Sequence, residues 1–456
     1  MLRGMKTPSP RPASPGVVGR VTGALDGFIQ RWLPEPLVIV IGLTFFVFAL
    51  GIVVEGASPT AMVGYFGDGF WNLLTFAMQM ALVLVTGFVF ASTPLFARLL
   101  GAIARRARTP GQAIVLVTLV SLAASWINWG FGLVIGALFA KRLAREVPEV
   151  DYRVLIASGY SGFLIWHAGL SGSIPLTAAT PGNFLEDEIG LIPASATIFS
   201  PANLILLAVI CAGLPFLNRM MLNHGGPVTR AGDVHLGDQD ERRVHVDGPT
   251  PAQRLERWPW LGRAVGVFGL AFLALQVARG EFALTLNTVN FAFLFAGLLL
   301  HGSARDFLDA LDEAVKGVGG ILIQFPFYAG VMGMMVGSGL AASVTDLFVG
   351  GANATVLPLL AFLSAGVVNV LVPSGGGQWA VQGPIVMPAA EALGADMPRV
   401  LLAIAWGDAW TNMIQPFWAL PALAVAGLSA RDIMGFCVLV LIASGAVLML
   451  GLTFLP

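Results

Sequence analysis

The sequence contains very little charge. Only 11% of its 456 residues are Asp, Glu, Lys or Arg, whereas a typical soluble domain has about 25%. Hydrophobic residues make up 56% of the chain, and the mean hydropathy is +0.81. This composition excludes a water-soluble surface, so we expect an integral protein of the lipid bilayer. The formal net charge of −1 excludes nucleic acid as a partner.

Cysteine is nearly absent as well, and the N-terminal segment does not have the pattern of a signal peptide. The two cysteines, Cys211 and Cys437, lie inside apolar stretches and have no spacing typical of a disulfide or a zinc site. Residues 1–35 are polar, proline-rich and basic, and the first apolar run begins near Leu37. That run is late and long for a signal peptide. We therefore predict a cytoplasmic N-terminal tail over 1–35 and no cofactor.

Apolar stretches long enough to cross the hydrocarbon core, which takes about 20 residues, occur along the whole chain. They lie at 36–54, 71–100, 152–182, 200–218, 262–279, 285–301, 317–345, 398–428 and 432–455. Two further stretches, 112–142 and 354–392, are interrupted halfway by polar residues and glycines. Irregular backbone at membrane depth must be buried in protein or line a cavity. We therefore predict an all-α membrane protein with about nine transmembrane helices and two opposed re-entrant hairpins.

Basic residues orient these elements. With the N-terminus inside, all 25 Lys and Arg residues except Arg279 and Arg399 fall on cytoplasmic segments or their helix ends. Such segregation is the positive-inside rule. We therefore predict a multi-pass protein of the bacterial cytoplasmic (inner) membrane, with a cytoplasmic loop at 219–261 and an external C-terminus.

An internal repeat relates the two halves of the chain. Residues 153–157 (Arg-Val-Leu-Ile-Ala) match 399–403 (Arg-Val-Leu-Leu-Ala) at an offset of 246. The same offset places the polar tip residue Asn128 of the first hairpin on Ser374 of the second. Matched tips at a near-constant offset favour duplication over chance similarity of apolar patterns.

The repeats span 36–218 and 285–456, and a linker helix at 262–279 lies between them. Because the first repeat begins inside and the second outside, they are inverted, and their hairpins enter from opposite faces. Inverted repeats with discontinuous helices are typical of secondary transporters that work by alternating access.

Four segments combine irregular backbone with polar side chains at membrane depth: the two hairpin tips and two interrupted helices. Helix N-termini there suit a carboxylate, and freed carbonyls suit a dehydrated cation. The candidate substrate-binding residues are Asn128, Trp129, His167, Ser171, Ser173, Ser374, Gln378 and Thr411. The candidate cation or coupling residues are Asp408, Asn412, Gly130, Gly172, Gly375, Gly376 and Gly377.

His167 and Asp408 are the ionisable residues that lie well inside the predicted spans, a position that indicates function. A histidine bonded to a neighbouring helix is the plain alternative for His167, whereas Asp408 needs a proton, a cation or a cluster of donors. No Lys or Arg falls at the predicted midplane, so a di- or tricarboxylate would leave buried charges unpaired. Aromatic residues near the tips suit a short alkyl tail, and they are Trp126, Trp129, Phe131, Trp379, Trp410, Phe417 and Trp418.

These motifs resemble the bacterial short-chain fatty acid transporter family, the AtoE-type acetoacetate and butyrate permeases. The resemblance runs through Asn128–Gly132, Gly169–Pro175, Thr180–Asn183 and Pro373–Ala380. It implies cation-coupled symport of a small monocarboxylate. More distantly, the layout is similar to the ion transporter superfamily, which implies a homodimer and Na+ sites at the hairpin tips.

The tips depart from the Ser-Asn-Thr pattern of that superfamily. They read Ile127-Asn128-Trp129 and Ser374-Gly375-Gly376. This departure leaves the coupling ion open between Na+ and H+, with a proton carried through Asp408 or His167.

Two other functions are compatible with parts of the sequence. An uncoupled carboxylate facilitator or channel would share most of the architecture. An intramembrane serine protease would use Ser171 in Gly169-Leu-Ser-Gly172, but it needs a histidine base from another helix. His167 lies four positions before Ser171 on the same interrupted helix. We therefore expect a transporter and not an enzyme.

Overall fold

The computed structural model describes residues 36–223, 228–234, 250–316, 318–341, 343, 351–371, 374–415, 418–419, 422–423 and 426–455. Within these ranges every regular element is a helix, which confirms the predicted all-α class. The predicted tail over 1–35, Pro373 of the second tip and the aromatic Phe417 lie outside the described residues.

The first half of the chain extends from α2 to α11. Its helices are α2 (Pro36–Glu55), α3 (Pro59–Gly69), α4 (Leu74–Ala91), α5 (Pro94–Ala104), α6 (Pro110–Ile127), α7 (Trp129–Glu146), α8 (Tyr152–Ser161), the 3-10 helix η1 (Gly162–Ala168), α9 (Ser173–Ala179), α10 (Glu186–Ile189) and α11 (Pro201–Met220).

The second half follows a connecting region. The connecting helices are η2 (Met221–Asn223), η3 (Ala231–Asp233), α12 (Pro251–Glu256) and α13 (Pro259–Arg279). The helices of the second half are α14 (Leu286–Leu300), α15 (Ala304–Val315), α16 (Gly319–Ser338), α18 (Leu357–Leu371), α19 (Gly375–Ala392), α20 (Met397–Thr411), the 3-10 helix η4 (Asn412–Ile414) and α22 (Ala430–Phe454).

Several helices begin at a hydroxyl residue followed by proline. The hydroxyl oxygens of Ser58, Thr109 and Ser200 accept hydrogen bonds from backbone N–H groups in the first turns of α3, α6 and α11. Proline at the first helical position needs no N–H partner and has a helical φ. These pairs therefore fix where each helix starts.

Among the described residues, seven helices are long and apolar enough to cross a membrane. They are Leu74–Ala91, Pro110–Ile127, Tyr152–Ala179, Pro201–Met220, Pro259–Arg279, Gly319–Ser338 and Ala430–Phe454. A multi-pass membrane protein is thereby confirmed. The predicted span at 71–100 is divided, because Pro94 starts a new helix after Ser92 and Thr93.

Both predicted hairpins form pairs of antiparallel helices. In α6 and α7, a Cβ on Gly132 would contact Ser125, and one on Gly136 would contact Ser121. Only Asn128 joins the two helices. The pair α18 and α19 is tied by side-chain bonds from Gln378 to Ala365 O and from Gln382 to Ser364 Oγ. Because α6 by itself is long enough to cross a membrane, the re-entrant insertion of this hairpin stays a prediction.

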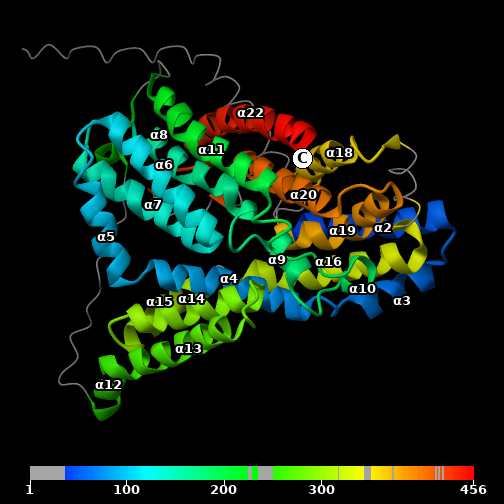
Figure 1. Ribbon diagram of the computed structural model, residues 1–456, viewed down its shortest axis with the longest axis horizontal. Helices are drawn as coiled ribbons and strands as arrows, with labels where there is room; N and C mark the ends of the chain where they lie inside the picture. The colour runs from blue at the N-terminus through cyan, green and yellow to red at the C-terminus, as the bar shows by residue number, and fades with distance from the viewer. Residues whose placement is uncertain are drawn as a thin grey trace, which may run out of the picture.

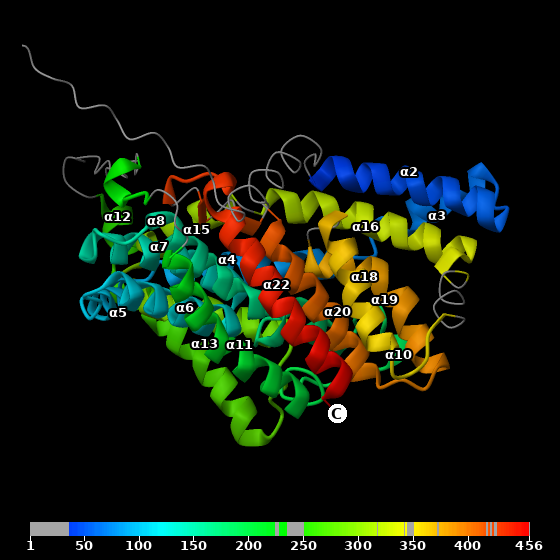
Figure 2. The ribbon, with the colours of Figure 1, turned by 90° about the horizontal axis from the view of Figure 1, so that it is seen from above.

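One long helix of each half packs against helices of the other half. The first-half helix α4 packs against α14 and α15, and the second-half helix α16 packs against α2 and α3. Figures 1 and 2 show α2, α3 and α16 running side by side along one edge of the molecule. A second group of helices packs together beside this group. It contains α6–α9, α11, α18–α20 and α22. The segment Tyr152–Ala179 lies at their centre, and 94% of its most apolar 18-residue window is buried.

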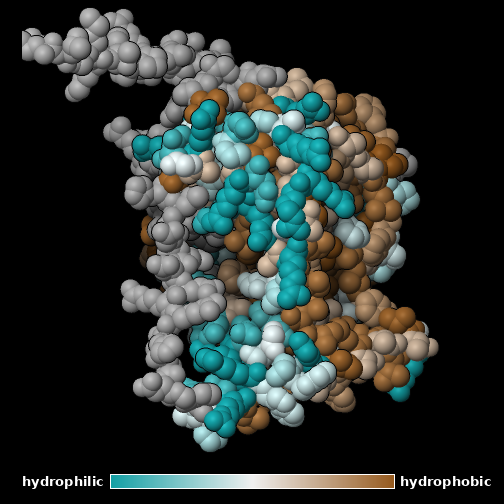
Figure 3. All heavy atoms as spheres, turned by 90° about the vertical axis from the view of Figure 1, so that its left-hand side faces the viewer, coloured by the Kyte–Doolittle hydropathy of each residue, from teal (hydrophilic) through white to brown (hydrophobic). Residues whose placement is uncertain are grey.

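Hydrophilic side chains gather on part of one end of the molecule, beside a hydrophobic surface (Figure 3). This end carries α5 and α12. The exposed basic residues of α5, of the turn after it and of the end of α7 are Arg98, Arg105, Arg106, Arg108, Arg142 and Arg145. Charge therefore gathers at a helix end, as in a protein whose middle lies in lipid.

Candidate functional site

Two interrupted helices meet at the centre of the fold. The segment α8–η1 of the first half contacts α20 of the second half, and both lose α-helical geometry near the contact, at Gly162 and at Asn412. Trp166 Nε1 donates a hydrogen bond to Asn412 Oδ1 at 3.1 Å across this contact. Both interruptions were predicted from the sequence, but their direct contact was not.

His167 and Asp408 form a buried pair between the two halves. His167 Nε2 lies 3.1 Å from Asp408 Oδ2, and both side chains are 0% exposed. His167 Nδ1 and Asp408 Oδ1 make no hydrogen bond to any described residue. A buried polar atom without a partner costs about 1–3 kcal/mol. The pair therefore has two atoms placed to bind a proton, a cation, a water molecule or a substrate group.

Amide side chains fix the position of Asp408. Asn369 Nδ2 donates to Asp408 O at 2.8 Å and to Thr411 Oγ1 at 2.9 Å. Asn412 Nδ2 donates to the same Asp408 carbonyl at 3.0 Å. Sequence reasoning found Thr411 and Asn412 but missed Asn369. The signal for Asn369 was a lone asparagine inside the apolar run of α18.

The first hairpin tip contacts the interrupted helix of its own half. Asn128 caps α7, because its Oδ1 accepts a hydrogen bond from Phe131 N at 2.9 Å. Trp129 N donates to Ser171 Oγ at 2.9 Å, and Leu170 N donates to Trp126 O at 2.7 Å. The structure therefore brings together Asn128, Trp129 and Ser171, as the sequence predicted.

The second hairpin tip reaches the interrupted helix of the other half. Ser374 caps α19 with φ −159° and ψ 112°, close to the φ −155° and ψ 128° of Asn128. A Cβ on Gly375 would lie 2.5 Å from His167 Nε2 and 2.7 Å from Ser173 Oγ. Only glycine permits this approach, so the tip, His167 and Ser173 belong to one site.

The other predicted glycines have different surroundings. A Cβ on Gly172 would meet His167 O at 2.3 Å, which places this glycine in the tight turn beside the site. Gly130 packs against the backbone of α4 at Leu84. Gly376 and Gly377 face the rings of Phe76 and Tyr328. Close helix packing explains these last three glycines.

Gln378 is held within its own hairpin. Its Nε2 donates to Ala365 O and to Gln382 Oε1, each at 3.1 Å. These bonds tie α19 to α18, and they do not join Gln378 to the His167–Asp408 pair. Its Oε1 makes no hydrogen bond within the described part of the chain.

Aromatic rings cover one side of the site. The Trp166 ring stacks on His167 at a centroid distance of 3.6 Å and on Phe163 at 5.4 Å. Trp129 contacts Trp166 at 5.9 Å and Trp418 at 5.4 Å. Of the predicted aromatics, Trp129 and Trp418 join this wall. Others lie elsewhere: Phe131 packs against Phe90 and Phe96, and Trp410 against Phe362.

The geometry does not fit serine hydrolysis. The Ser171 hydroxyl oxygen accepts a hydrogen bond from Trp129 N–H, and His167 instead contacts Asp408. In the part of the chain that the structure describes, no histidine is hydrogen-bonded to Ser171. Ser171 therefore serves as the acceptor that joins the first tip to the interrupted helix.

Substitution of Ser171 by alanine tests this connection. We expect Ser171→Ala to lower the free energy of unfolding by about 1–3 kcal/mol, because it leaves the buried Trp129 N–H without an acceptor. The matched control is Ser92→Ala, at an exposed serine that bonds only to Phe88 O of its own helix. Denaturant titration of both purified variants in detergent measures the difference. Equal stability of the two variants would contradict the assigned role.

Comparison with known proteins identifies close relatives. A family model described as "Short chain fatty acid transporter" matches residues 17–455. A protein of Escherichia coli (strain K12) named "Putative short-chain fatty acid transporter" is 46% identical over 439 residues, covering 96% of this chain and 100% of the relative. A protein of the same name from Haemophilus influenzae is 44% identical, again over 96% of this chain and 100% of the relative.

Two solved transporter structures share the fold. The YdaH transporter of Alcanivorax borkumensis aligns with a TM-score of 0.58 at 18% identity, over 92% of this chain and 97% of YdaH. MtrF of Neisseria gonorrhoeae, described with a class of antimetabolite efflux pumps, aligns with a TM-score of 0.59 at 16% identity, over 94% and 97%. At such identities the likeness concerns the fold alone.

Proposed function

The chain belongs to the short-chain fatty acid transporter family, a family of membrane transporters and not of enzymes, and from this membership we propose that it is a cation-coupled symporter. Its substrates are short-chain fatty acids or similar small monocarboxylates, such as butyrate and acetoacetate. The coupling ion is Na+ or H+.

The buried contact between His167 and Asp408, in which each side chain has only one of its two polar atoms paired, supports this proposal most strongly. Each residue has one buried atom without a partner among the described residues, and Ser173 Oγ beside them is in the same condition. Asp408 can take up the proton or neutralise the cation, and the second tip and the aromatic wall can hold a carboxylate with a short tail. Among the described residues, Asp408 is the one acid at this site. One cation neutralises it, so the substrate's single carboxylate is held by the helix N-terminus at the second tip and by nearby hydroxyl groups.

Repetition of the helix order supports alternating access. Each half runs through a long helix, an antiparallel hairpin with a capped tip and an interrupted helix. Trp166 and Asn412, which are hydrogen-bonded, are 246 residues apart, the offset that relates the two repeats. Two equivalent residues touch only if they lie near the axis that relates the halves. We propose that the halves are inverted, that both hairpins are re-entrant, and that their movement exposes the site to either side.

Membrane orientation follows from charge. The exposed arginines at the hydrophilic end (Figure 3) lie on segments predicted to be cytoplasmic. We propose that the N-terminus is cytoplasmic, that the C-terminus is external, and that a homodimer is embedded in the inner membrane of a bacterium.

Transport measurements test the function directly. Purified protein in proteoliposomes is given radiolabelled butyrate or acetoacetate under an inward Na+ gradient, an inward H+ gradient, or neither. We expect accumulation above the external concentration under one gradient only. Equal uptake under all three conditions would instead indicate the uncoupled facilitator, because a carrier without a coupling ion cannot concentrate its substrate. No carboxylate uptake under any condition would refute the substrate class.

Bound Na+ would need oxygen ligands of a particular kind. The structure, in its described ranges, has no group of three or more His, Cys, Asp or Glu side chains that could hold a metal. Backbone carbonyls, amides and hydroxyls near Asp408 would supply the remaining ligands, which suits a hard cation.

A further inference from the structure

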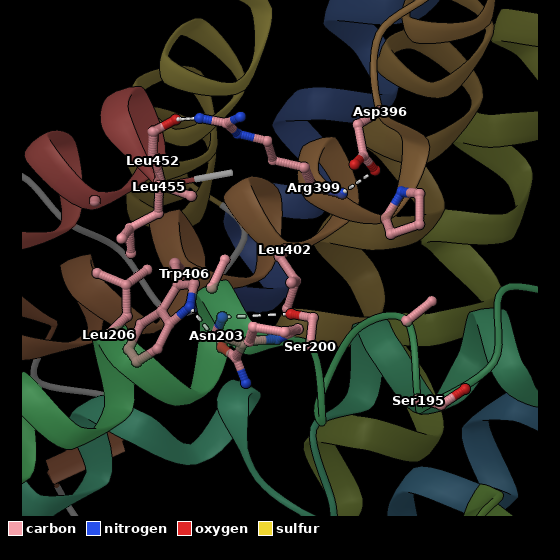
Figure 4. A pocket seen from close by; sticks show the side chains of 15 residues that line it. Ser195, Ser200, Asn203, Leu206, Asp396, Arg399, Leu402, Trp406, Leu452 and Leu455 are labelled. Carbon is pink, nitrogen blue, oxygen red and sulfur yellow. Dashed lines mark hydrogen bonds between the residues drawn. The ribbon is translucent and has the colours of Figure 1, made fainter.

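A pocket lies apart from the His167–Asp408 pair. It has a volume of about 410 Å³ and lies where α11, α20, α22 and the loop before α11 meet (Figure 4). Small-molecule sites usually measure about 300–1,000 Å³ and are mostly apolar with a few polar groups. This pocket fits that description, because leucines, alanines, prolines and Trp406 make most of its wall apolar.

Arg399 supplies the positive charge of the pocket. Its Nη2 donates to Leu452 O at the C-terminal end of α22, at 2.6 Å. Among the described residues, no carboxylate pairs with its guanidinium. Asp396 lies at the same rim, but its Oδ1 caps α20 by accepting a hydrogen bond from the backbone N of Arg399. The guanidinium therefore retains N–H donors for an anion.

The equivalent arginine of the first repeat is arranged differently. Arg153, at the offset of 246 from Arg399, lies 3.3 Å from the Asp151 carboxylate. That carboxylate neutralises the guanidinium of Arg153, whereas the guanidinium of Arg399 has a backbone carbonyl as its partner. An unneutralised arginine beside an apolar wall is the feature that distinguishes this pocket.

The floor of the pocket connects to the central site. Trp406 Nε1 donates to Asn203 Oδ1 at 3.0 Å (Figure 4). Asn203 Nδ2 donates to Ala168 O at 3.4 Å, and Ala168 follows His167 in the interrupted helix. Trp406 lies on α20, two positions before Asp408. One layer of side chains and backbone therefore separates the pocket from the central pair.

We propose that this pocket is a peripheral capture site for the transported monocarboxylate on the external side. The guanidinium of Arg399 binds the carboxylate, and the short alkyl chain lies against Leu402, Leu452 and Trp406. The substrate then passes the Asn203–Trp406 contact to reach His167 and Asp408. This inference rests on the function proposed above, and it adds a residue that raises affinity without taking part in coupling.

Kinetics of an Arg399→Gln variant test the capture site. We expect the KM for butyrate uptake to rise about tenfold, as for the loss of one hydrogen bond to a charged group, while the maximal rate stays within about twofold. Arg279→Gln is the control, because Arg279 is the other arginine predicted on the external side and is exposed at the end of α13. Added salt should raise the KM of the wild type and of Arg279→Gln but not that of Arg399→Gln.

A second variant fills the pocket without touching the charge. Leu402→Trp places a bulky indole ring in the wall and is expected to raise the KM by a similar factor. An unchanged KM and salt dependence in Arg399→Gln would overturn the capture site, and so would normal kinetics of Leu402→Trp if Arg399→Gln did not fold. If wild-type protein failed to carry any monocarboxylate, the proposed function would fail first, which separates the two conclusions.

Discussion

We expect Asp408→Asn to abolish gradient-driven accumulation of the carboxylate and to leave the protein folded. Asparagine has the same shape and keeps the backbone carbonyl that Asn369 and Asn412 bind. It cannot carry a negative charge or release a proton. Removing one partner of a buried charged contact costs on the order of 2–5 kcal/mol, so we expect the initial uptake rate to fall by roughly 30-fold or more.

The control for Asp408→Asn is a carboxylate outside the site. Asp68 is exposed on α3, and Asp68→Asn should transport as the wild type does. Uptake into proteoliposomes under the effective gradient compares the two variants, and exchange of internal for external substrate shows whether binding survives. Accumulation by Asp408→Asn at the wild-type level would remove Asp408 from the coupling mechanism.

Gly375→Ala should inactivate transport by steric overlap. The new methyl group would lie 2.5 Å from His167 Nε2 and 2.7 Å from Ser173 Oγ, so the tip or the imidazole ring must move. Overpacking of a tight site costs about 1–3 kcal/mol, and any movement also disturbs the contact between His167 and Asp408. We expect the uptake rate to fall by about tenfold or more.

A glycine in open space provides the comparison. A Cβ at Gly213, in the middle of α11, would meet no atom within 4 Å. Gly213→Ala should therefore keep normal uptake and gain slightly in stability, since alanine favours the helix. If Gly375→Ala and Gly213→Ala transported equally well, the second tip would not need its close approach to His167. Gel filtration of both variants in detergent checks that each is folded.

The sequence alone predicted the elements of this fold because membrane insertion leaves few choices. Long apolar runs and the polar tips at Asn128 and Ser374 are local signals, and they appear in the structure as helices and as helix caps. The predicted spans at 285–301 and 398–428 contain helices of 15 residues each. Hydropathy measures how apolar a stretch is, and it does not show where the helix geometry changes.

The site was predicted residue by residue but not as an arrangement. His167 and Asp408 were chosen because ionisable residues are costly in lipid. Their contact joins residues 241 positions apart, and no local pattern reports such a pairing. Asn369 was missed because one asparagine in an apolar helix has no periodic partner. Gly375 was chosen for its backbone, whereas its neighbours at Gly376 and Gly377 pack against aromatic rings.

The packing of a second-half helix against first-half helices has a consequence for biosynthesis. Helices α2 and α3 pack against α16, and α16 begins at Gly319, long after α2 ends at Glu55. At about 5–20 residues per second, the ribosome needs roughly 13–50 s to make the chain between them. During that time α2 and α3 lack α16, against which they finally pack. The first half therefore cannot reach its native packing until most of the protein has been translated.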